Sequence, residues 1–164
     1  MSSERVAEIL LNTKAVTLRP SNPYEFVSGI LSPIYCDNRL LMSHVKEREE
    51  VSHLFVELIQ GHETDILAGT ESAGIPWAAW VSNEIEKPII YVRKKTKDHG
   101  KENLIEGLLT EGQKVAVIED LISTGGSSMN AVNAVRQAGG NVDLCYAIFT
   151  YEFDKSKRLF TEGD

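Results

Sequence analysis

The segment from Val115 to Ser128, VAVIEDLISTGGSS, constrains the fold of this chain more than any other. Four consecutive apolar residues (115–118) predict a buried strand, and two adjacent carboxylates follow directly. A turn rich in Gly and Ser then leads into a helical pattern over 127–138. This strand–turn–helix order is the unit from which parallel α/β sheets are built.

The rest of the chain extends the same alternation of strands and helices. Apolar spacing predicts helices over 3–12, 45–60 and 76–85, and strands over 66–68, 88–92 and 142–149. Between the first two helices, a stretch rich in Pro, Ser, Asn and Gly predicts a small lobe of short strands at 24–27 and 34–36. We therefore expect one domain over 1–164, with an N-terminal helix and hood (1–40), an α/β core (45–150) and a flexible loop (93–104).

The residues after the strand at 115–118 suit a phosphorylated sugar. Ligands of open α/β folds lie at the carboxyl ends of the strands, where Glu119 and Asp120 can accept hydrogen bonds from vicinal hydroxyls. Amides of 124–128 at a helix start can hold a phosphate, and Gly125 and Gly126 let the backbone approach it. The alternative is a pair of solvated acids followed by an ordinary helix cap at Ser123 or Thr124.

A basic segment lies between two of the predicted strands. Residues 93–101 read RKKTKDHGK and carry five lysine or arginine side chains against one aspartate. One interpretation is a solvated hairpin tip. The other is a flexible cationic loop that closes over an anionic ligand and neutralises a departing group. His99, with an ordinary pKa near 6.5, is a candidate proton donor to that group.

Composition excludes several classes of function. The net charge of −7 argues against a nucleic-acid surface, and no apolar run approaches the roughly 18 residues of a membrane span. Cys36 and Cys145 lack the spacing of a redox or zinc motif. They predict reduced thiols in a cytoplasmic protein, with a disulfide as the alternative. The sequence shows no Cys/His cluster typical of a metal site.

These motifs together resemble a known enzyme family. EDLISTGGS after four apolar residues resembles the signature with which type I phosphoribosyltransferases bind phosphoribosyl pyrophosphate (PRPP). Three further segments resemble the orotate phosphoribosyltransferases: SGILSPIYCDNR (28–39), AGTESAGIPWAAW (68–80) and YVRKKTKDHGKENLIEG (91–107). The resemblance implies a type I phosphoribosyltransferase-like parallel sheet flanked by helices, with a small N-terminal hood of short strands.

The resemblance also implies an activity and a site. The activity is transfer of the phosphoribosyl group of PRPP to orotate, giving orotidine 5′-monophosphate and pyrophosphate in pyrimidine (UMP) synthesis. The implied catalytic residues are Arg93, Lys94, Lys97 and His99. The implied PRPP-binding residues are Thr70, Glu119, Asp120, Leu121, Ile122, Ser123, Thr124, Gly125, Gly126 and Ser127. Ser123, Tyr35 and Cys36 are implied orotate contacts.

The resemblance further implies that Mg²⁺ is carried by PRPP without protein metal ligands, and that a homodimer shares the loop 93–104 between subunits. The chain departs from the family pattern at Leu31, where members often carry lysine, and at Ala73, where some members do, and it is short at its C-terminus. Two alternatives therefore stay open. One is a non-catalytic PRPP-binding regulator or truncated paralogue, and the other is a phosphoribosyltransferase for another base.

Overall fold

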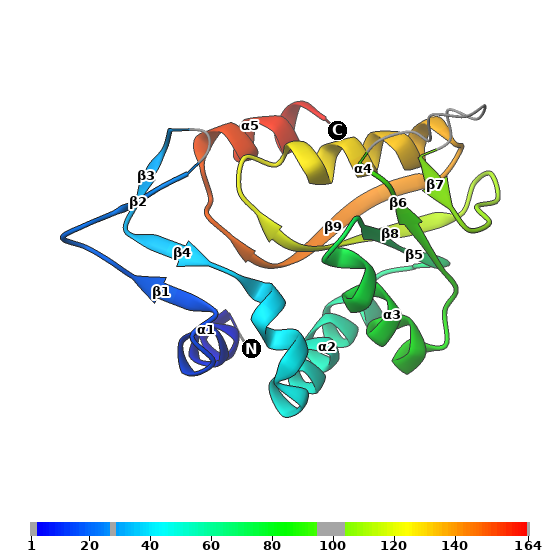
Figure 1. Cartoon of the computed structure of the whole chain (residues 1–164). Coiled ribbons are helices and arrows are strands. Elements are labelled where there is room, and N and C mark those ends of the chain that lie inside the picture. Colours follow the sequence, from blue (N-terminus) through cyan, green and yellow to red (C-terminus); the bar gives the residue numbers. More distant parts are fainter. Residues whose placement is uncertain (1–2, 27–28, 95–103, 164) are drawn as a thin grey trace. The chain divides into compact units, whose positions relative to one another are not determined.

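A computed structural model describes residues 3–26, 29–94 and 104–163. The chain forms two compact units, Met1–Val51 and Ser52–Asp164. Figure 1 shows the elements of each unit. The expectation of one domain over 1–164 stays a prediction.

The first unit contains short strands and helices. Its elements are α1 (Ser3–Asn12), β1 (Val16–Leu18), β2 (Tyr24–Glu25), β3 (Leu31–Ser32), β4 (Ile34–Cys36), the 3-10 helix η1 (Asn38–Ser43) and the start of α2 (Val45–Gln60). β1 pairs with β4 and β2 pairs with β3, both antiparallel. The short N-terminal strands and the helices over 3–12 and 45–60 confirm the sequence-based expectation, while β1, β3 and η1 were not predicted.

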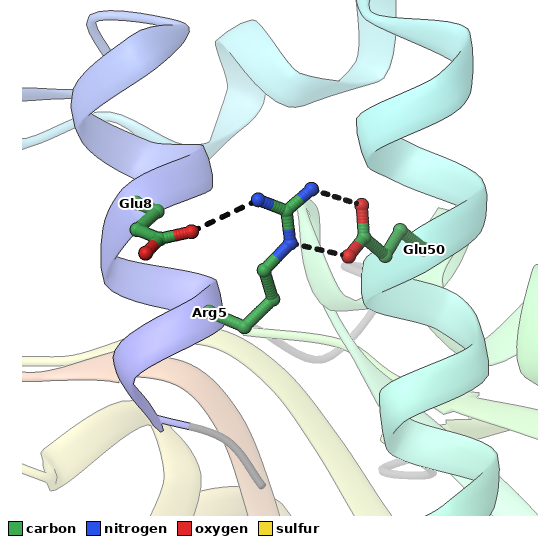
Figure 2. Close-up of polar contacts among 3 residues, drawn as sticks. All are labelled: Arg5, Glu8 and Glu50. Atoms are coloured by element: carbon green, nitrogen blue, oxygen red, sulfur yellow. Dashed lines mark hydrogen bonds and ion pairs between the residues drawn. The ribbon is translucent and has the colours of Figure 1, made fainter.

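An ion-pair network joins α1 to α2 within this unit (Figure 2). The guanidinium of Arg5 donates from Nε and Nη2 to the two carboxylate oxygens of Glu50, at 2.5 and 2.8 Å, and from Nη1 to Glu8 at 3.0 Å. The hydrogen bond from Arg5 lowers the pKa of Glu50. All three side chains are solvent-exposed, so salt screens the network. The network therefore adds little to the free energy of unfolding, and its main effect is to align the two helices through the forked contact.

The second unit is built on one five-stranded sheet. Its elements after α2 are β5 (Ile66–Thr70), α3 (Gly74–Ile85), β6 (Ile89–Val92), β7 (Ile105–Glu106), β8 (Lys114–Ile122), α4 (Gly126–Gln137), β9 (Asn141–Thr150) and α5 (Asp154–Glu162). The strand order is β7-β6-β5-β8-β9, in which β6, β5, β8 and β9 run parallel and β7 is antiparallel. The predicted parallel sheet flanked by helices is confirmed.

Helices α3 and α4 cover opposite faces of this sheet (Figure 1). Alternate strand residues such as Ala68 and Val117 form one buried cluster with Val132 and Val135 of α4. The residues between them face α3: a Cβ on Gly69 would lie 3.1 Å from the Cβ of Ala78. Because side chains alternate along a strand, this register assigns Thr70 and Glu119 to the face of α4.

The structure differs from the sequence-based expectation at the end of β8. The strand was predicted over 115–118 but continues to Ile122, because β9 goes on pairing with it through Glu119↔Ala147 and Leu121↔Phe149. The two acids therefore belong to the strand itself. β7 and α5 were not predicted. Within the described ranges, no helix is both long and apolar enough to cross a membrane.

Candidate functional site

The carboxyl ends of three parallel strands meet at one edge of the sheet in the second unit. β5 ends at Thr70, β6 at Val92 and β8 at Ile122. Short turns then lead from β5 into α3 and from β8 into α4. This edge is where open α/β sheets bind their ligands, and most of the predicted site residues in this unit lie along it.

Glu119 is a buried carboxyl at this edge, with 5% of its surface exposed. One oxygen accepts hydrogen bonds from the Thr70 hydroxyl at 2.6 Å and from the Asp120 amide at 3.1 Å. The other oxygen accepts from the Ser128 hydroxyl at 3.4 Å. Burial raises the pKa of Glu119 to about 7, and the neighbouring Asp120 carboxyl adds to the rise. Glu119 therefore titrates near neutral pH.

Asp120 occupies a different environment from its neighbour. It is only half-buried, whereas Glu119 is buried. The two carboxyls nevertheless lie close together, because the Asp120 side chain contributes to the raised pKa of Glu119. Of the two predicted ribose ligands, Asp120 is the more accessible to a ligand at the strand edge.

The turn after β8 has the conformation that an anion-binding helix start requires. Gly125 takes a left-handed conformation, with φ 83°, and α4 begins at Gly126. A Cβ on Gly126 would meet open space, so a ligand can approach the backbone there. The first amides of a helix have no intrahelical acceptor and can donate to a phosphate. The predicted strand–turn–helix arrangement is confirmed, with the helix starting one residue earlier than expected.

Helix α5 supports this turn from behind. A Cβ on Gly125 would lie 3.3 Å from the Phe160 ring and from the Ser156 Cβ. Arg136 of α4 donates to the carbonyls of Gly163 and Val142. These contacts hold the C-terminal helix against the start of α4. Sequence reasoning missed this support, although the apolar pair Leu159 and Phe160 was its available signal.

The basic segment begins at the stem formed by β6 and β7. The Arg93 amide donates to the Leu104 carbonyl at 2.8 Å, which joins the two ends of the loop 93–104. The Lys94 amide donates to the Glu71 carboxylate at 2.7 Å, which ties this stem to the turn after β5. The Arg93 guanidinium lies 3.8 Å from the Glu106 carboxylate. Lys97 and His99 lie outside the described residues, so their predicted roles stay predictions.

Tyr35 and Cys36 belong to β4 in the first unit. The Tyr35 side chain is exposed, with its ring centroid 5.2 Å from that of Tyr24. Cys36 is buried, and its thiol donates to Asn38 at 3.0 Å. Both cysteines are free thiols, as predicted. The predicted contacts of Tyr35 and Cys36 with orotate stay predictions.

The structure thus brings together one group of predicted residues: Thr70, Arg93, Lys94 and the run from Glu119 to Ser127. It adds three side chains that sequence reasoning did not select. Glu71 accepts from the start of the basic segment, and Ser128 and Cys145 lie beside Glu119. Glu71 and Cys145 act on elements that are distant in the chain, whereas Ser128 reaches Glu119 across the turn between β8 and α4.

Comparison with known proteins agrees with this geometry. Residues 42–158 match the phosphoribosyl transferase domain. The chain is 54% identical over 167 residues to orotate phosphoribosyltransferase of Listeria innocua, covering 100% of this chain and 80% of that protein. It is 51% identical over 156 residues to the Halalkalibacterium halodurans protein of the same name, covering 94% and 74%. The crystal structure of orotate phosphoribosyltransferase from Aeropyrum pernix superposes with a TM-score of 0.82 at 25% identity, covering 96% of this chain and 88% of that one.

The resemblance drawn from the four sequence segments is therefore confirmed over nearly the whole chain. The site residues lie on the fold that these relatives share, and the matched domain includes β5, β8 and both turns that follow them. The chain belongs to the phosphoribosyl transferase domain family and, within it, to the orotate phosphoribosyltransferases.

Proposed function

We propose that this protein transfers the phosphoribosyl group of PRPP to orotate, producing orotidine 5′-monophosphate and pyrophosphate for pyrimidine synthesis. The observation that carries the proposal is the edge of the sheet, where an accessible carboxylate, Asp120, precedes an open glycine turn and a helix start. The names of the relatives at about half identity support orotate as the accepting base.

In this proposal the protein positions two substrates and stabilises charge. Asp120 accepts hydrogen bonds from the ribose hydroxyls, and the 5′-phosphate lies on the amides of the turn from Thr124 to Ser127. Thr70 and its turn lie beside the pyrophosphate, and Ser123 contacts orotate. The orotate nitrogen attacks the anomeric carbon as pyrophosphate leaves, so no protein nucleophile is needed. A contact between Glu119 and the sugar stays a prediction.

Mg²⁺ enters this proposal as a complex with PRPP. The half-buried side chains at the edge, Asp120 and Ser123, offer oxygen donors, which suit this cation. Mg²⁺ keeps several waters and commonly binds through substrate phosphates, where it neutralises their charge. A cytoplasmic location and a homodimer that shares the loop 93–104 complete the proposal.

A single assay tests the reaction and its alternatives. Purified protein with orotate, PRPP and Mg²⁺ should consume orotate, followed by its ultraviolet absorbance. PRPP binding by calorimetry without turnover of any base would favour the non-catalytic regulator. Turnover of adenine or another base in place of orotate would assign the chain to a different specificity.

Lys97→Ala tests the role of the basic segment. We expect turnover to fall by about 100-fold. This is the loss typical of removing one group that stabilises charge in the transition state. PRPP affinity should change much less, because the ribose and 5′-phosphate contacts stay intact. Lys95→Ala, in the same segment but outside the predicted contacts, is the matched control. Equal turnover in the Lys97 and Lys95 variants would remove Lys97 from the mechanism.

Mixing two inactive variants tests sharing of the loop between subunits. Every site of a Lys97→Ala dimer lacks the loop lysine, and every site of an Asp120→Ala dimer lacks the carboxylate proposed to bind the ribose. If the loop completes the partner's site, random exchange gives mixed dimers with one intact site, and activity should recover to about a quarter of wild type. Each variant alone, treated identically, is the control. No recovery after proven exchange would show that the loop serves its own subunit.

A further inference from the structure

Helix α5 packs beside α4 in the second unit (Figure 1). Leu159 and Phe160 of α5 pack against the buried cluster that contains Met129, in the first turn of α4. At the end of α5, a Cβ on Gly163 would overlap the Cε of Met129, and the Gly163 carbonyl accepts from Arg136. The second half of α5 is therefore attached to the helix that follows the glycine turn.

The same helix closes one side of that turn. Gly125 is buried and takes a left-handed conformation, with φ 83°. A Cβ on Gly125 would lie 3.3 Å from the Phe160 ring, 3.3 Å from the Ser156 Cβ and 3.4 Å from the Ser156 Cα. Ser156 is 3% exposed, and its hydroxyl donates to the Phe153 carbonyl at 2.8 Å within α5. The turn and α5 thus fit each other without space for a side chain at position 125.

The next residue of the turn has the opposite surroundings. A Cβ on Gly126 would meet open space. The first helical hydrogen bond runs from the Met129 amide to the Gly125 carbonyl at 3.0 Å, so the amides of 126–128 have no acceptor within α4. Their direction depends on the backbone angles of Gly125, which α5 contacts. One side of the turn is therefore closed by protein, while the other is open to a ligand.

We propose that α5 is part of the 5′-phosphate site, with Phe160 as a positioning residue that holds Gly125 in the conformation in which the following amides converge on the phosphate. This inference rests on the proposed function, because it names what holds the phosphate-binding turn in place. Phe160 acts through the turn. Packing of α5 and binding of the 5′-phosphate are therefore coupled, and each strengthens the other.

A purely structural role for α5 makes a different prediction. If Phe160 only covered the core, its removal would lower the free energy of unfolding, but the folded molecules would bind PRPP as before. Leu159 provides the matched comparison, because it packs in the same cluster from the adjacent position of α5. The atoms nearest to a Cβ on Gly125 belong to Phe160 and Ser156.

The first experiment compares Phe160→Ala, Leu159→Ala and wild type by urea unfolding and by steady-state kinetics. Both variants should be less stable than wild type, because each loses a partly buried apolar side chain. Phe160→Ala should raise the KM for PRPP about fivefold or more, the lower end of typical coupling between sites, with kcat at saturating PRPP within about twofold. Leu159→Ala should leave the KM within about twofold. Phe160→Met, which keeps a long apolar side chain, should restore most of the affinity.

The second experiment reads the coupling from the side of the helix, in wild-type protein. Hydrogen exchange of the amides of 154–163 is followed by mass spectrometry with saturating ribose 5-phosphate, with saturating pyrophosphate and without ligand. Because coupling is reciprocal, ribose 5-phosphate should slow exchange in α5. Pyrophosphate, which is proposed to bind beside the turn after β5, is the matched control and should leave it unchanged.

Either experiment can overturn the inference. Equal KM values for PRPP in Phe160→Ala and Leu159→Ala would reduce Phe160 to a core residue. Exchange in α5 that ignores ribose 5-phosphate, or that slows equally with pyrophosphate, would exclude a specific coupling to the 5′-phosphate, and this result does not require that Phe160→Ala folds. In both cases a wild type that still consumes orotate leaves the proposed function intact. Wild type that binds no PRPP by calorimetry would refute the proposed function, and the inference with it.

Discussion

Gly74→Ala is expected to destabilise the protein by about 3 kcal/mol or more, at the upper end of the cost of overpacking. The added methyl group would overlap the Ile118 carbonyl and the Thr70 hydroxyl, and the carbonyl belongs to the backbone of a central strand. Such a contact is relieved only by moving α3 away from β8. Urea unfolding followed by circular dichroism should show the loss, and PRPP binding should fall with it.

Gly126→Ala is the matched control for that experiment. Both glycines begin a helix, but a Cβ on Gly126 would meet open space, and its φ lies outside the left-handed region. Since alanine favours helix over glycine by up to about 1 kcal/mol, stability should be unchanged or slightly higher. PRPP affinity should nevertheless fall, because the methyl group occupies the proposed approach to the phosphate. Equal stability of the Gly74 and Gly126 variants would contradict the packing described for α3.

Trp77→Ala is expected to cost about 3–5 kcal/mol of the free energy of unfolding. Trp77 lies on α3 and has 0% of its surface exposed. Its ring centroid is 5.0 Å from that of Trp80 and 6.4 Å from that of Phe55 in α2. Removing it leaves a cavity between α3 and its neighbours. Because single domains are stable by about 5–15 kcal/mol in total, the midpoint of urea unfolding should fall sharply.

Trp77→Phe separates the loss of the ring from the loss of its polar atom. In the described part of the chain, the buried indole Nε1 has no hydrogen-bond partner. Phenylalanine keeps an aromatic ring and removes this unsatisfied group, so part of the lost packing is offset. The Phe variant should therefore cost less than half as much as the Ala variant. A Phe variant as unstable as the Ala variant would show that ring size alone decides the packing here.

Much of the second unit could be predicted because the apolar residues of each segment follow either the helical or the strand period. The helix over 45–60 and the strands around Ile66 and Val142 match the structure closely. The end of β8 could not be found this way. The apolar pattern stops at Ile118, but pairing with β9 continues the strand through the two carboxylates. α5 was missed because its residues are mostly polar, and Leu159 and Phe160 gain burial from α4.

The site could be predicted where backbone conformation selects the residue type. Gly125 takes a positive φ that few other residues adopt, so the turn could be recognised from the sequence. The separate environments of Glu119 and Asp120 could not be recognised. The burial of Glu119 involves Thr70, which lies 49 positions earlier in the chain and donates to its carboxyl.

The two tryptophans of the chain, Trp77 and Trp80, stand edge to face on one helix of the second unit. Intrinsic fluorescence excited at the indole band will therefore follow the surroundings of α3. An emission change on adding a ligand would locate the response near the helix that starts at Gly74. A matching probe for the first unit would have to be introduced, for example by replacing Tyr35 with tryptophan.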